Sequence, residues 1–346
     1  MTVDVKSTFR SKKFFYALIV VAIAAMPPLF VKSDYQVGQV LTPMIIFAIY
    51  ASSWNLLASS GQGSLGHAAF LGIGGFASAL AATRLGLPPL LGIVLGGFVS
   101  AGVGFLIGLA CVRLKAWFLA MVTFGFSVII VTVITQFDTF FGGVIGFPPQ
   151  LIAPRGAPFY YISLGIAAVS IIAMFFVTKS KLGLAFKAIH ENELESRMAG
   201  INTAKYKLIA FVISTFFAGL AGGLYVENIL LVHVSIFDAY NSFLPLIMAV
   251  IGGLGTIEGP IIGSIIIVSI DSWLPNIDKY IQPSLGPLFP AVSSVGPELR
   301  LIGIGLFLIL VVIFLPKGIT SLLRKGYDYL REDTSKTKKA KPDGKT

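Results

Sequence analysis

The sequence predicts an all-α protein, a polytopic bundle of about ten membrane-spanning helices. Hydrophobic residues make up 55% of the 346-residue chain, and charged residues only 12%. The surface of a soluble globular protein needs about a quarter of the chain to be charged. Most of this surface must therefore face lipid or other protein, and long apolar runs such as residues 87–112 carry no charge. The composition excludes a secreted domain, a cytosolic enzyme and a disordered chain.

Apolar stretches long enough to cross the hydrocarbon, which takes roughly 20 residues, recur along the chain. They predict spans at residues 14–31, 36–58, 66–83, 89–112, 116–137, 160–178, 207–230, 243–253, 259–274 and 299–316. The first stretch resembles a cleavable signal peptide, but an uncleaved first span fits the charge pattern better. The chain is thus divided into a basic N-terminal segment 1–13, a transmembrane domain 14–316 and a basic, partly disordered tail 317–346.

Basic residues determine the direction of the spans. With the N-terminus inside, four segments fall on the cytoplasmic side and carry 21 of the 26 basic residues. These segments are 1–13, 113–115, 179–207 and 317–346. The outer side keeps only Lys32, Arg84, Arg155, Lys279 and Arg300. Positive residues resist translocation, so this distribution predicts a multi-pass protein with both termini in the cytoplasm.

The same rule constrains residues 243–274. If this stretch crossed the membrane once, the basic tail would lie outside. The chain must therefore enter the membrane and return, with its turn at the glycine-rich residues 252–259. Irregular backbone at such depth is tolerated only where it is buried in protein or lines a cavity. Two short spans would give ten crossings, whereas a re-entrant pair would give eight crossings plus that pair.

Glycines spaced four residues apart recur in the spans. The pairs are Gly92/Gly96, Gly104/Gly108, Gly219/Gly223 and Gly259/Gly263. Small residues at this spacing let two helix backbones approach closely. We therefore expect these glycines to lie at helix contacts.

A different glycine cluster opens the third predicted span. Residues 61–67, Gly-Gln-Gly-Ser-Leu-Gly-His, combine glycines with polar side chains. In transporters, a broken helix start of this kind can offer free backbone groups to a substrate. Together with the later glycine-rich turn, the cluster predicts a substrate pathway that contains Gln62, Ser64, His67, Gly253 and Gly255. The two glycine-rich elements lie in opposite halves of the chain, which leaves a two-repeat architecture open.

Ser64 and His67 are three residues apart, so we expect them to share a helix face. No acidic residue near them in sequence would orient the histidine, as a nucleophile and base pair requires. We expect them to bond to neighbouring helices or to line a path. Glu227, Glu258 and Asp271 fall near predicted span ends, whereas ion-coupled carriers keep ionisable groups at the midplane.

Motifs of enzymes are absent from the sequence. It contains no H-E-x-x-H, no G-x-S-x-G and no G-x-x-x-x-G-K-[ST]. We expect no catalytic residue, metal site or cofactor in this chain, so any ATP-driven work needs a partner subunit. The single cysteine, Cys111, allows no intrachain disulfide. Residues 336–346 have no aromatic residues among their lysines, and we expect no nucleic-acid binding.

The cytoplasmic segment, residues 179–207, carries the signals of a short helix at about 193–199. Asn192 can cap its start, with Glu195 at the spacing of a capping box. Gly200 stands where a left-handed residue ends a helix. Either Asn202 or Thr203 can then cap the next span.

Apolar residues on the cytoplasmic segment leave two uses open. One stripe consists of Leu194 and Met198, and another of Leu182, Phe186 and Ile189. They fit a segment that lies on lipid or on its own bundle, or one that docks into a groove of another protein. An acidic cluster, unfavourable beside anionic lipid, favours the protein partner; it consists of Glu191, Glu193 and Glu195.

Three long motifs carry a family resemblance. They are Gly-Gln-Gly-Ser-Leu-Gly-His-Ala-Ala-Phe at 61–70, Lys-Tyr-Lys-Leu-Ile-Ala-Phe-Val-Ile-Ser-Thr-Phe-Phe-Ala-Gly-Leu-Ala-Gly-Gly-Leu-Tyr at 205–225, and Gly-Gly-Leu-Gly-Thr-Ile-Glu-Gly-Pro-Ile-Ile-Gly at 252–263. From about residue 38 to 320 the chain resembles the branched-chain amino acid ABC-transporter permeases, specifically the longer of the two paired permeases.

By this resemblance, the cytoplasmic segment is similar to the coupling segment that contacts the ATPase subunit. The usual pattern is a glutamate, small residues and then a glycine, and Glu193 and Gly200 match its ends. Glu195 and Ser196 stand where alanines are common. The ATPase-coupling residues that the resemblance implies are Glu193, Leu194, Glu195, Met198 and Gly200.

The resemblance implies a permease subunit of an ATP-binding-cassette importer in the bacterial inner membrane. It would form half of the pathway for branched-chain or related amino acids. Its implied partners are a paired homologous permease, two ATPase subunits that use the ATP, an external solute-binding protein, membrane lipid and the amino-acid substrate. Relatives leave urea, amides and aromatic acids open as cargo. Rival classes are a stand-alone ion-coupled carrier, which would transport without an ATPase, and a membrane-embedded enzyme or scaffold, which would show no flux.

Overall fold

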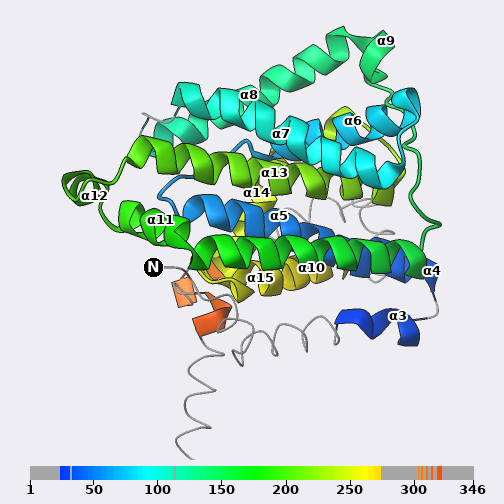
Figure 1. Cartoon of the computed structure of the whole chain (residues 1–346). Coiled ribbons are helices and arrows are strands. Elements are labelled where there is room, and N and C mark those ends of the chain that lie inside the picture. Colours follow the sequence, from blue (N-terminus) through cyan, green and yellow to red (C-terminus); the bar gives the residue numbers. More distant parts are fainter. Residues whose placement is uncertain are drawn as a thin grey trace, which may run out of the picture.

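The chain folds into a bundle of helices, seen in a computed structural model (Figure 1). The structure describes residues 24–31, 33–111, 114, 116–273, 303, 305–306, 309–310, 313–314 and 318–321. Several predicted segments lie wholly or largely outside these residues: 1–13, most of the spans 14–31 and 299–316, the turn 113–115 except Leu114, and most of the tail 317–346.

Helices account for the regular structure in the described part of the chain. In order they are α3 (Pro27–Phe30), α4 (Asp34–Gln36), the π-helical η1 (Val37–Leu41), α5 (Thr42–Ala58), α6 (His67–Leu85), α7 (Pro89–Cys111), α8 (Ala116–Gln136), α9 (Asp138–Phe141), α10 (Ala157–Lys179), α11 (Lys181–Glu191), α12 (Glu193–Met198), α13 (Thr203–Ile229), the 3-10 helix η2 (Val234–Phe237), α14 (Ala239–Gly252) and α15 (Glu258–Trp273). The described residues contain no strand, only an isolated bridge between Phe147 and Val232. The predicted all-α class is confirmed.

Six segments in the described part are long and apolar enough to cross a membrane. They are Asp34–Ala58, His67–Leu85, Pro89–Cys111, Trp117–Gln136, Ala157–Lys179 and Thr203–Ile229. Each coincides, within a few residues, with one of the spans predicted between residues 36 and 230. This agreement supports a multi-pass helical membrane protein.

The α14–α15 pair corresponds to the predicted stretch that enters and returns. Helix α14 has 14 residues, so at about 1.5 Å per residue it is roughly 21 Å long, and the described part of α15 has 16 residues. A typical hydrocarbon core is about 30 Å thick. The helices pack against each other and against α5, and the chain reverses between Gly252 and Glu258. The count of ten crossings stays a prediction.

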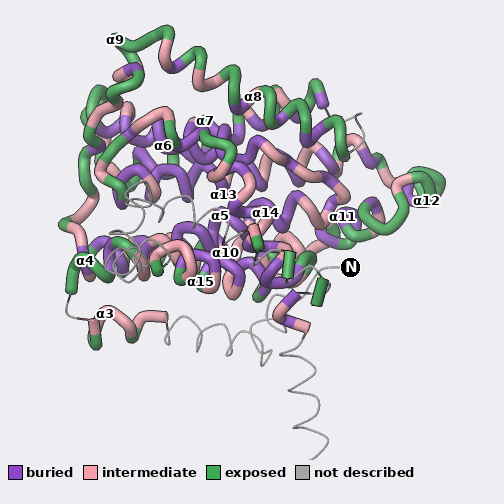
Figure 2. Tube along the Cα trace, turned by 180° about the vertical axis from the view of Figure 1, so that it is seen from behind, coloured by how far each residue is buried: buried purple, intermediate pink, exposed green. Residues whose placement is uncertain are grey.

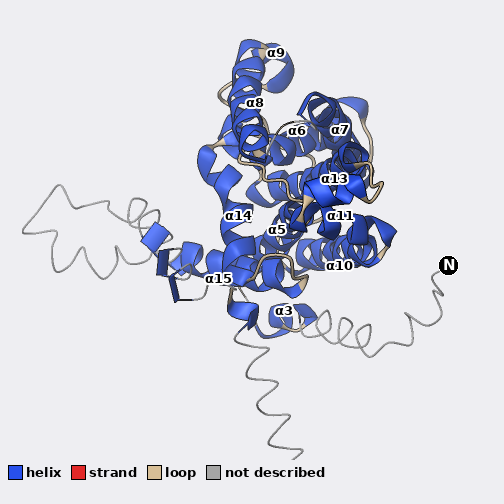
Figure 3. Cartoon of the chain, turned by 90° about the vertical axis from the view of Figure 1, so that its left-hand side faces the viewer, coloured by secondary structure: helices blue, strands red, loops and turns tan. Residues whose placement is uncertain are grey.

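The bundle has a protected centre and an exposed periphery. Helix α5 contacts α10, α13, α14 and α15, and α6, α7 and α13 pack against one another (Figures 1 and 3). In the spans that contain α5 and α13, 72% of the most apolar stretch of 18 residues is buried inside the protein. The corresponding buried share is only 28% in α8 and 22% in α10. Figure 2 shows exposed residues along α8. The outer helices therefore offer apolar surface to lipid or to a partner subunit.

Glycines allow the closest backbone approaches among α6, α7 and α13. A Cβ atom on Gly74 would overlap the backbone of Gly219, and one on Gly96 would overlap the carbonyl oxygen of Gly74. Seven of the eight predicted glycines face a neighbouring helix in this way, and Gly259 faces the turn before α15. The expectation that spaced glycines lie at helix contacts is confirmed.

We predict that Gly219→Val destabilises the bundle, because a Cβ at this position would lie 2.5 Å from the Cβ of Ser100. Overpacking of this kind costs about 1–3 kcal/mol. Thermal unfolding of the detergent-purified protein should show a lower midpoint. The matched control is Gly102→Val, because no atom lies within 4 Å of its Cβ position. Equal midpoints for the two variants would contradict the close-packing argument.

Candidate functional site

Helix α11 forms the buried half of residues 179–207, the segment predicted to be cytoplasmic. The Ser180 hydroxyl caps its start by accepting a hydrogen bond from the backbone N–H of Leu182 at 3.1 Å. Phe186 and Ile189 are buried, and α11 packs against α10 and α13. This apolar stripe therefore folds against its own bundle, which is one of the two uses that the sequence left open.

Helix α12 begins at the predicted cap. The side-chain oxygen of Asn192 accepts hydrogen bonds from the backbone N–H groups of Leu194 (3.0 Å) and Glu195 (3.2 Å). Glu195 accepts from the side-chain amide of Asn192 at 2.6 Å, whereas a capping box would use the backbone N–H. The cap is confirmed, and Glu195 bonds back to Asn192 through the side-chain amide in place of the backbone N–H of a capping box.

Helix α12 ends in a Schellman motif. Gly200 has φ +83°, and its backbone N–H donates to the carbonyl oxygen of Arg197 at 3.0 Å. The N–H of Ile201 donates to the carbonyl oxygen of Ser196 at 3.0 Å. The predicted role of Gly200 is confirmed. Asn202 then caps α13 by accepting from the N–H of Lys205, so the alternative cap, Thr203, is free for other contacts.

The apolar side chains of α12 do not join the core. Leu194 is 68% exposed and Met198 is 82% exposed, and the helix projects from the end of the bundle (Figure 1). A short helix with exposed apolar residues is marginal by itself. The segment therefore consists of a buried helix that anchors it and a projecting helix that is open to a partner.

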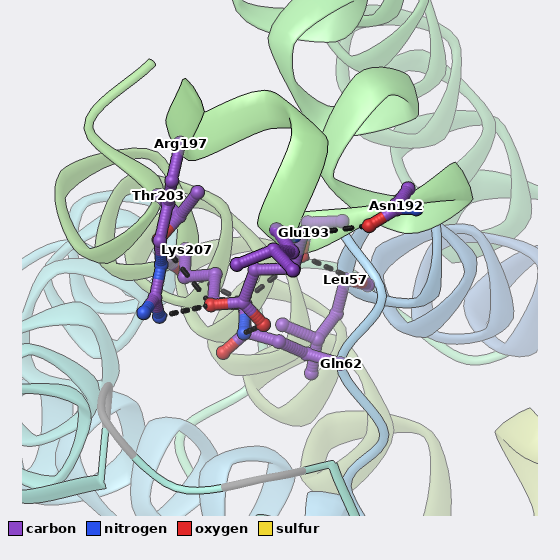
Figure 4. Close-up of polar contacts among 9 residues, drawn as sticks. Leu57, Gln62, Asn192, Glu193, Arg197, Thr203 and Lys207 are labelled. Carbon is purple, nitrogen blue, oxygen red and sulfur yellow. Dashed lines mark hydrogen bonds and ion pairs between the residues drawn. The ribbon is translucent and has the colours of Figure 1, made fainter. Parts of the chain in front are cut away.

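Glu193 holds α12 against α13 (Figure 4). Its Oε2 lies 2.5 Å from Nζ of Lys207, and its Oε1 lies 2.6 Å from Nη2 of Arg197. The hydroxyl of Thr203 donates to the same Oε1 at 3.2 Å and accepts from Nε of Arg197 at 3.0 Å. Both carboxylate oxygens are therefore used inside the chain.

The charge of Glu193 compensates that of Lys207, whose side chain is only 7% exposed. Burying a cation away from water is costly unless it is paired. Burial acts to raise the pKa of Glu193, but hydrogen bonds and charge from Lys207 and Arg197 outweigh it, so the pKa is lowered. Glu193 is thus ionised at neutral pH and serves as an internal brace.

Gln62 and Ser64 lie in the loop that precedes α6. The amide Nε2 of Gln62 donates to the Ser60 hydroxyl and to the carbonyl oxygen of Lys207, both at 2.9 Å. The carbonyl oxygen of Ser64 accepts from Nε1 of Trp54 at 2.8 Å. Because α6 begins at His67, Ser64 and His67 do not share a helix face, and that expectation is wrong. Helix α6 thus begins only at the last residue of the polar cluster.

His67 lies inside the bundle, fully buried. Its Nε2 is 3.1 Å from the Ser53 hydroxyl, and its ring stacks on Tyr50 with centroids 5.3 Å apart. Among the described residues, neither the His67 Nδ1 nor the Ser64 hydroxyl has a hydrogen-bond partner. The bond from His67 to Ser53 of α5 matches the expected contact with a neighbouring helix, whereas the Ser64 hydroxyl makes no such bond among the described residues.

The turn with Gly253 and Gly255 is held by Asn55 of α5. The Asn55 side chain donates to the carbonyl oxygen of Thr256 at 2.8 Å and accepts from the N–H of Gly255 at 2.9 Å. A small cavity of about 60 Å³ lies beside this turn. It is lined in part by Asn55, Gly255, Met174 and Lys187. The predicted pathway residues thus form two groups. Gln62, Ser64 and His67 belong to one and Gly253 and Gly255 to the other, and α5 contacts both groups.

Sequence reasoning missed the internal partners of Glu193 and the clamp at Asn55. Arg197 was detectable, because it lies four residues after Glu193 on the predicted helix. Asn55 was detectable as an amide within an apolar span. No local signal indicated Lys207, since its approach depends on the path of residues 199–202.

The described residues contain no group of three or more His, Cys, Asp or Glu side chains that could hold a metal.

Comparisons with known proteins agree with these features. The family model described as branched-chain amino acid transport system / permease component matches residues 36–314. The chain is 27% identical to the high-affinity branched-chain amino acid transport system permease protein LivM of Salmonella typhimurium, and 26% identical to LivM of Escherichia coli. Each match covers 84% of this chain and 75% of the relative. A guanosine ABC transporter permease, NupQ of Bacillus subtilis, is 35% identical over 21% of this chain and 23% of its own. No solved structure matches the chain.

We predict that Gly200→Val loosens α12, because a left-handed backbone costs a residue with a Cβ about 1–2 kcal/mol. Hydrogen exchange of the α12 amides should become faster. Gly200→Asn is the matched control, since asparagine tolerates this conformation. No atom lies within 4 Å of the Cβ position, so steric overlap does not explain a difference. Equal exchange in both variants would show that the left-handed turn does not hold the helix.

We predict a coupling free energy of about 1–2 kcal/mol between Glu193 and Lys207. It would be measured in a cycle of Glu193→Gln, Lys207→Met and the double variant, from hydrogen exchange of the α12 amides. Because the folded-state pKa of Glu193 is lowered from 4.5, this stabilisation is complete above about pH 4.5 and disappears as the pH falls through the lowered value. Additive single effects at neutral pH would rule out the brace.

Proposed function

Because the chain belongs to the family of branched-chain amino acid transport system permease components, we propose that it forms one half of the translocation pathway of an ATP-driven importer. The chain is a permease subunit of an ABC importer and works without changing its substrate covalently. A paired permease would complete the pathway, and two separate subunits would hydrolyse the ATP. An external solute-binding protein would deliver the cargo.

The observation that carries this proposal is the two-part cytoplasmic segment. Helix α11 is anchored in the bundle, while α12 exposes Leu194 and Met198 at 68% and 82%. An amphipathic helix of this kind docks its apolar side chains into a groove of a partner protein. We assign that groove to the ATPase subunit. Glu193 supports this contact indirectly, by holding α12 in place, because its carboxylate is already bound by Lys207 and Arg197.

The contacts of α12 give a route for the movement. A displacement of α12 acts on Lys207 and Thr203 at the start of α13. Helix α13 packs against α5, α6 and α7, so it carries the displacement into the centre of the bundle. The ATPase can shift the bundle between outward-open and inward-open states only by binding α12 differently in the two states.

The membrane arrangement follows from the charge pattern. We propose a bacterial inner-membrane location with both termini in the cytoplasm. Helix α14, at roughly 21 Å, is shorter than a typical hydrocarbon core. Of the two counts, eight crossings plus a re-entrant pair fits this length better than ten. Exposed apolar faces on α7 and α8, including Phe98, Leu106 and Met121, would meet lipid or the paired permease.

Branched-chain amino acids are the cargo we propose, since the relatives that match most of the chain are named for them. Urea, amides and aromatic acids are the alternatives within the family. The cargo is tested by competition: each solute would be added to proteoliposomes that contain the complete importer and labelled leucine. Failure of unlabelled leucine, isoleucine and valine to compete would reject the proposed cargo.

We predict that Leu194→Glu and Met198→Glu abolish ATP-driven uptake, because each places a charge in the apolar contact with the ATPase. Both side chains are exposed, so the permease should fold normally. The measurement is the amount of ATPase that co-purifies, together with uptake into proteoliposomes. Met198→Leu serves as the control that keeps the apolar surface. Full uptake by the glutamate variants, or transport by the chain without any ATPase, would overturn the assignment.

A further inference from the structure

The loop of residues 59–66, between α5 and α6, lies directly against the cytoplasmic segment. A Cβ atom on Gly61 would be 3.3 Å from the Cα of His190 in α11. Gly61 also has φ +75°, a conformation that lets the chain turn at this contact. The loop therefore contacts the end of α11 at Gly61 before it enters α6.

Gln62 connects this loop to α13. Its side chain is buried, with 6% of the residue exposed. The amide nitrogen uses its two hydrogens on the Ser60 hydroxyl and on the Lys207 carbonyl oxygen, each at 2.9 Å. These bonds leave the amide hydrogens unavailable to a substrate. The contact thus differs from the pathway role that the sequence predicted for Gln62.

Lys207 is the point where two connections meet. Its ammonium group is bound by Glu193 of α12, and its carbonyl oxygen is bound by Gln62. Figure 4 shows Glu193, Lys207 and Gln62 side by side. A buried hydrogen bond of this kind is costly to leave unmade, so a shift of α12 that moves Lys207 must also move Gln62 or break the bond.

The far end of the loop is tied to the interior helices. The N–H of Leu65 donates to the Thr123 hydroxyl of α8 at 3.3 Å, and Trp54 of α5 donates to the Ser64 carbonyl oxygen at 2.8 Å. Gly66 is packed so closely on α8 that a Cβ atom would overlap the Thr123 backbone. The next residue, His67, begins α6. Displacement of the loop therefore reaches α5, α6 and α8 together.

We propose that Gln62 is a positioning residue that passes movement of the cytoplasmic segment, through the Lys207 carbonyl group, to the start of α6. The proposal rests on the proposed function, since it requires an ATPase that moves α12. This connection is a second route for the movement, in addition to the one through the packing of α13. In this role Gln62 acts on the start of α6 without touching the substrate.

The test compares Gln62→Met with Ser60→Ala in proteoliposomes that contain the complete importer. Methionine keeps the volume and apolar stem but cannot donate to Lys207. Ser60→Ala removes the other bond of the same amide and keeps the Lys207 bond. We expect Gln62→Met to retain its ATPase subunits and to lower the solute taken up per ATP hydrolysed by roughly tenfold, the size of a typical coupling between sites. Ser60→Ala should leave this ratio unchanged.

Three outcomes would overturn the proposal. One is an unchanged ratio in Gln62→Met, and another is an equal loss in Ser60→Ala. The third is a raised KM for the solute at an unchanged ratio, which would return Gln62 to the substrate pathway. If Gln62→Met does not accumulate, Gln62→Leu, which also cannot donate to the Lys207 carbonyl group, decides by the same ratio. Failure of the proposed function is distinguishable, since the unaltered protein would then transport without ATP.

Discussion

The buried ammonium group of Lys207 is the constraint on which the functional end of this molecule depends. A cation at the start of a membrane helix needs an opposite charge, and Glu193 supplies it from the other side of a tight turn. That pairing fixes how α12 leaves the bundle, because Glu193 is the first residue of α12 and Lys207 lies in the second turn of α13. Arg197 and Thr203 complete the shell of the carboxylate, so the connection is a network rather than a single contact.

This brace separates two tasks within one short segment. Glu193 of α12 faces Lys207 and holds the helix in position, whereas Leu194 and Met198 are exposed on its surface, where we propose that a partner docks. A flexible attachment would absorb the movement of a partner. A braced one transmits it to α13, whose glycine contacts with α6 and α7 leave little room for independent motion. The proposed coupling to an ATPase requires rigidity at this point, and close backbone packing provides it.

Local chemistry explains why much of the architecture was predictable. Span positions follow from apolar length, and the caps of α12 follow from Asn192 and Gly200, because such signals act within one helical turn. The failed details were also local in origin. Ser64 was placed on a helix that begins only at His67, and Glu195 bonds to a side-chain amide where a backbone group was expected. Element boundaries depend on competing bonds that differ by small free energies.

The sequence by itself determined an all-α membrane protein, the positions of its central spans, and a short capped helix that starts after Asn192. Only the tertiary structure decided that Glu193 points inward to Lys207, that Gln62 bonds to the same residue, and that Asn55 clamps the turn at Gly255. The reason is physical: hydrophobic periodicity specifies that a helix exists but leaves its rotation and neighbours open. Contacts between residues 145 or 200 positions apart arise only once the helices have packed.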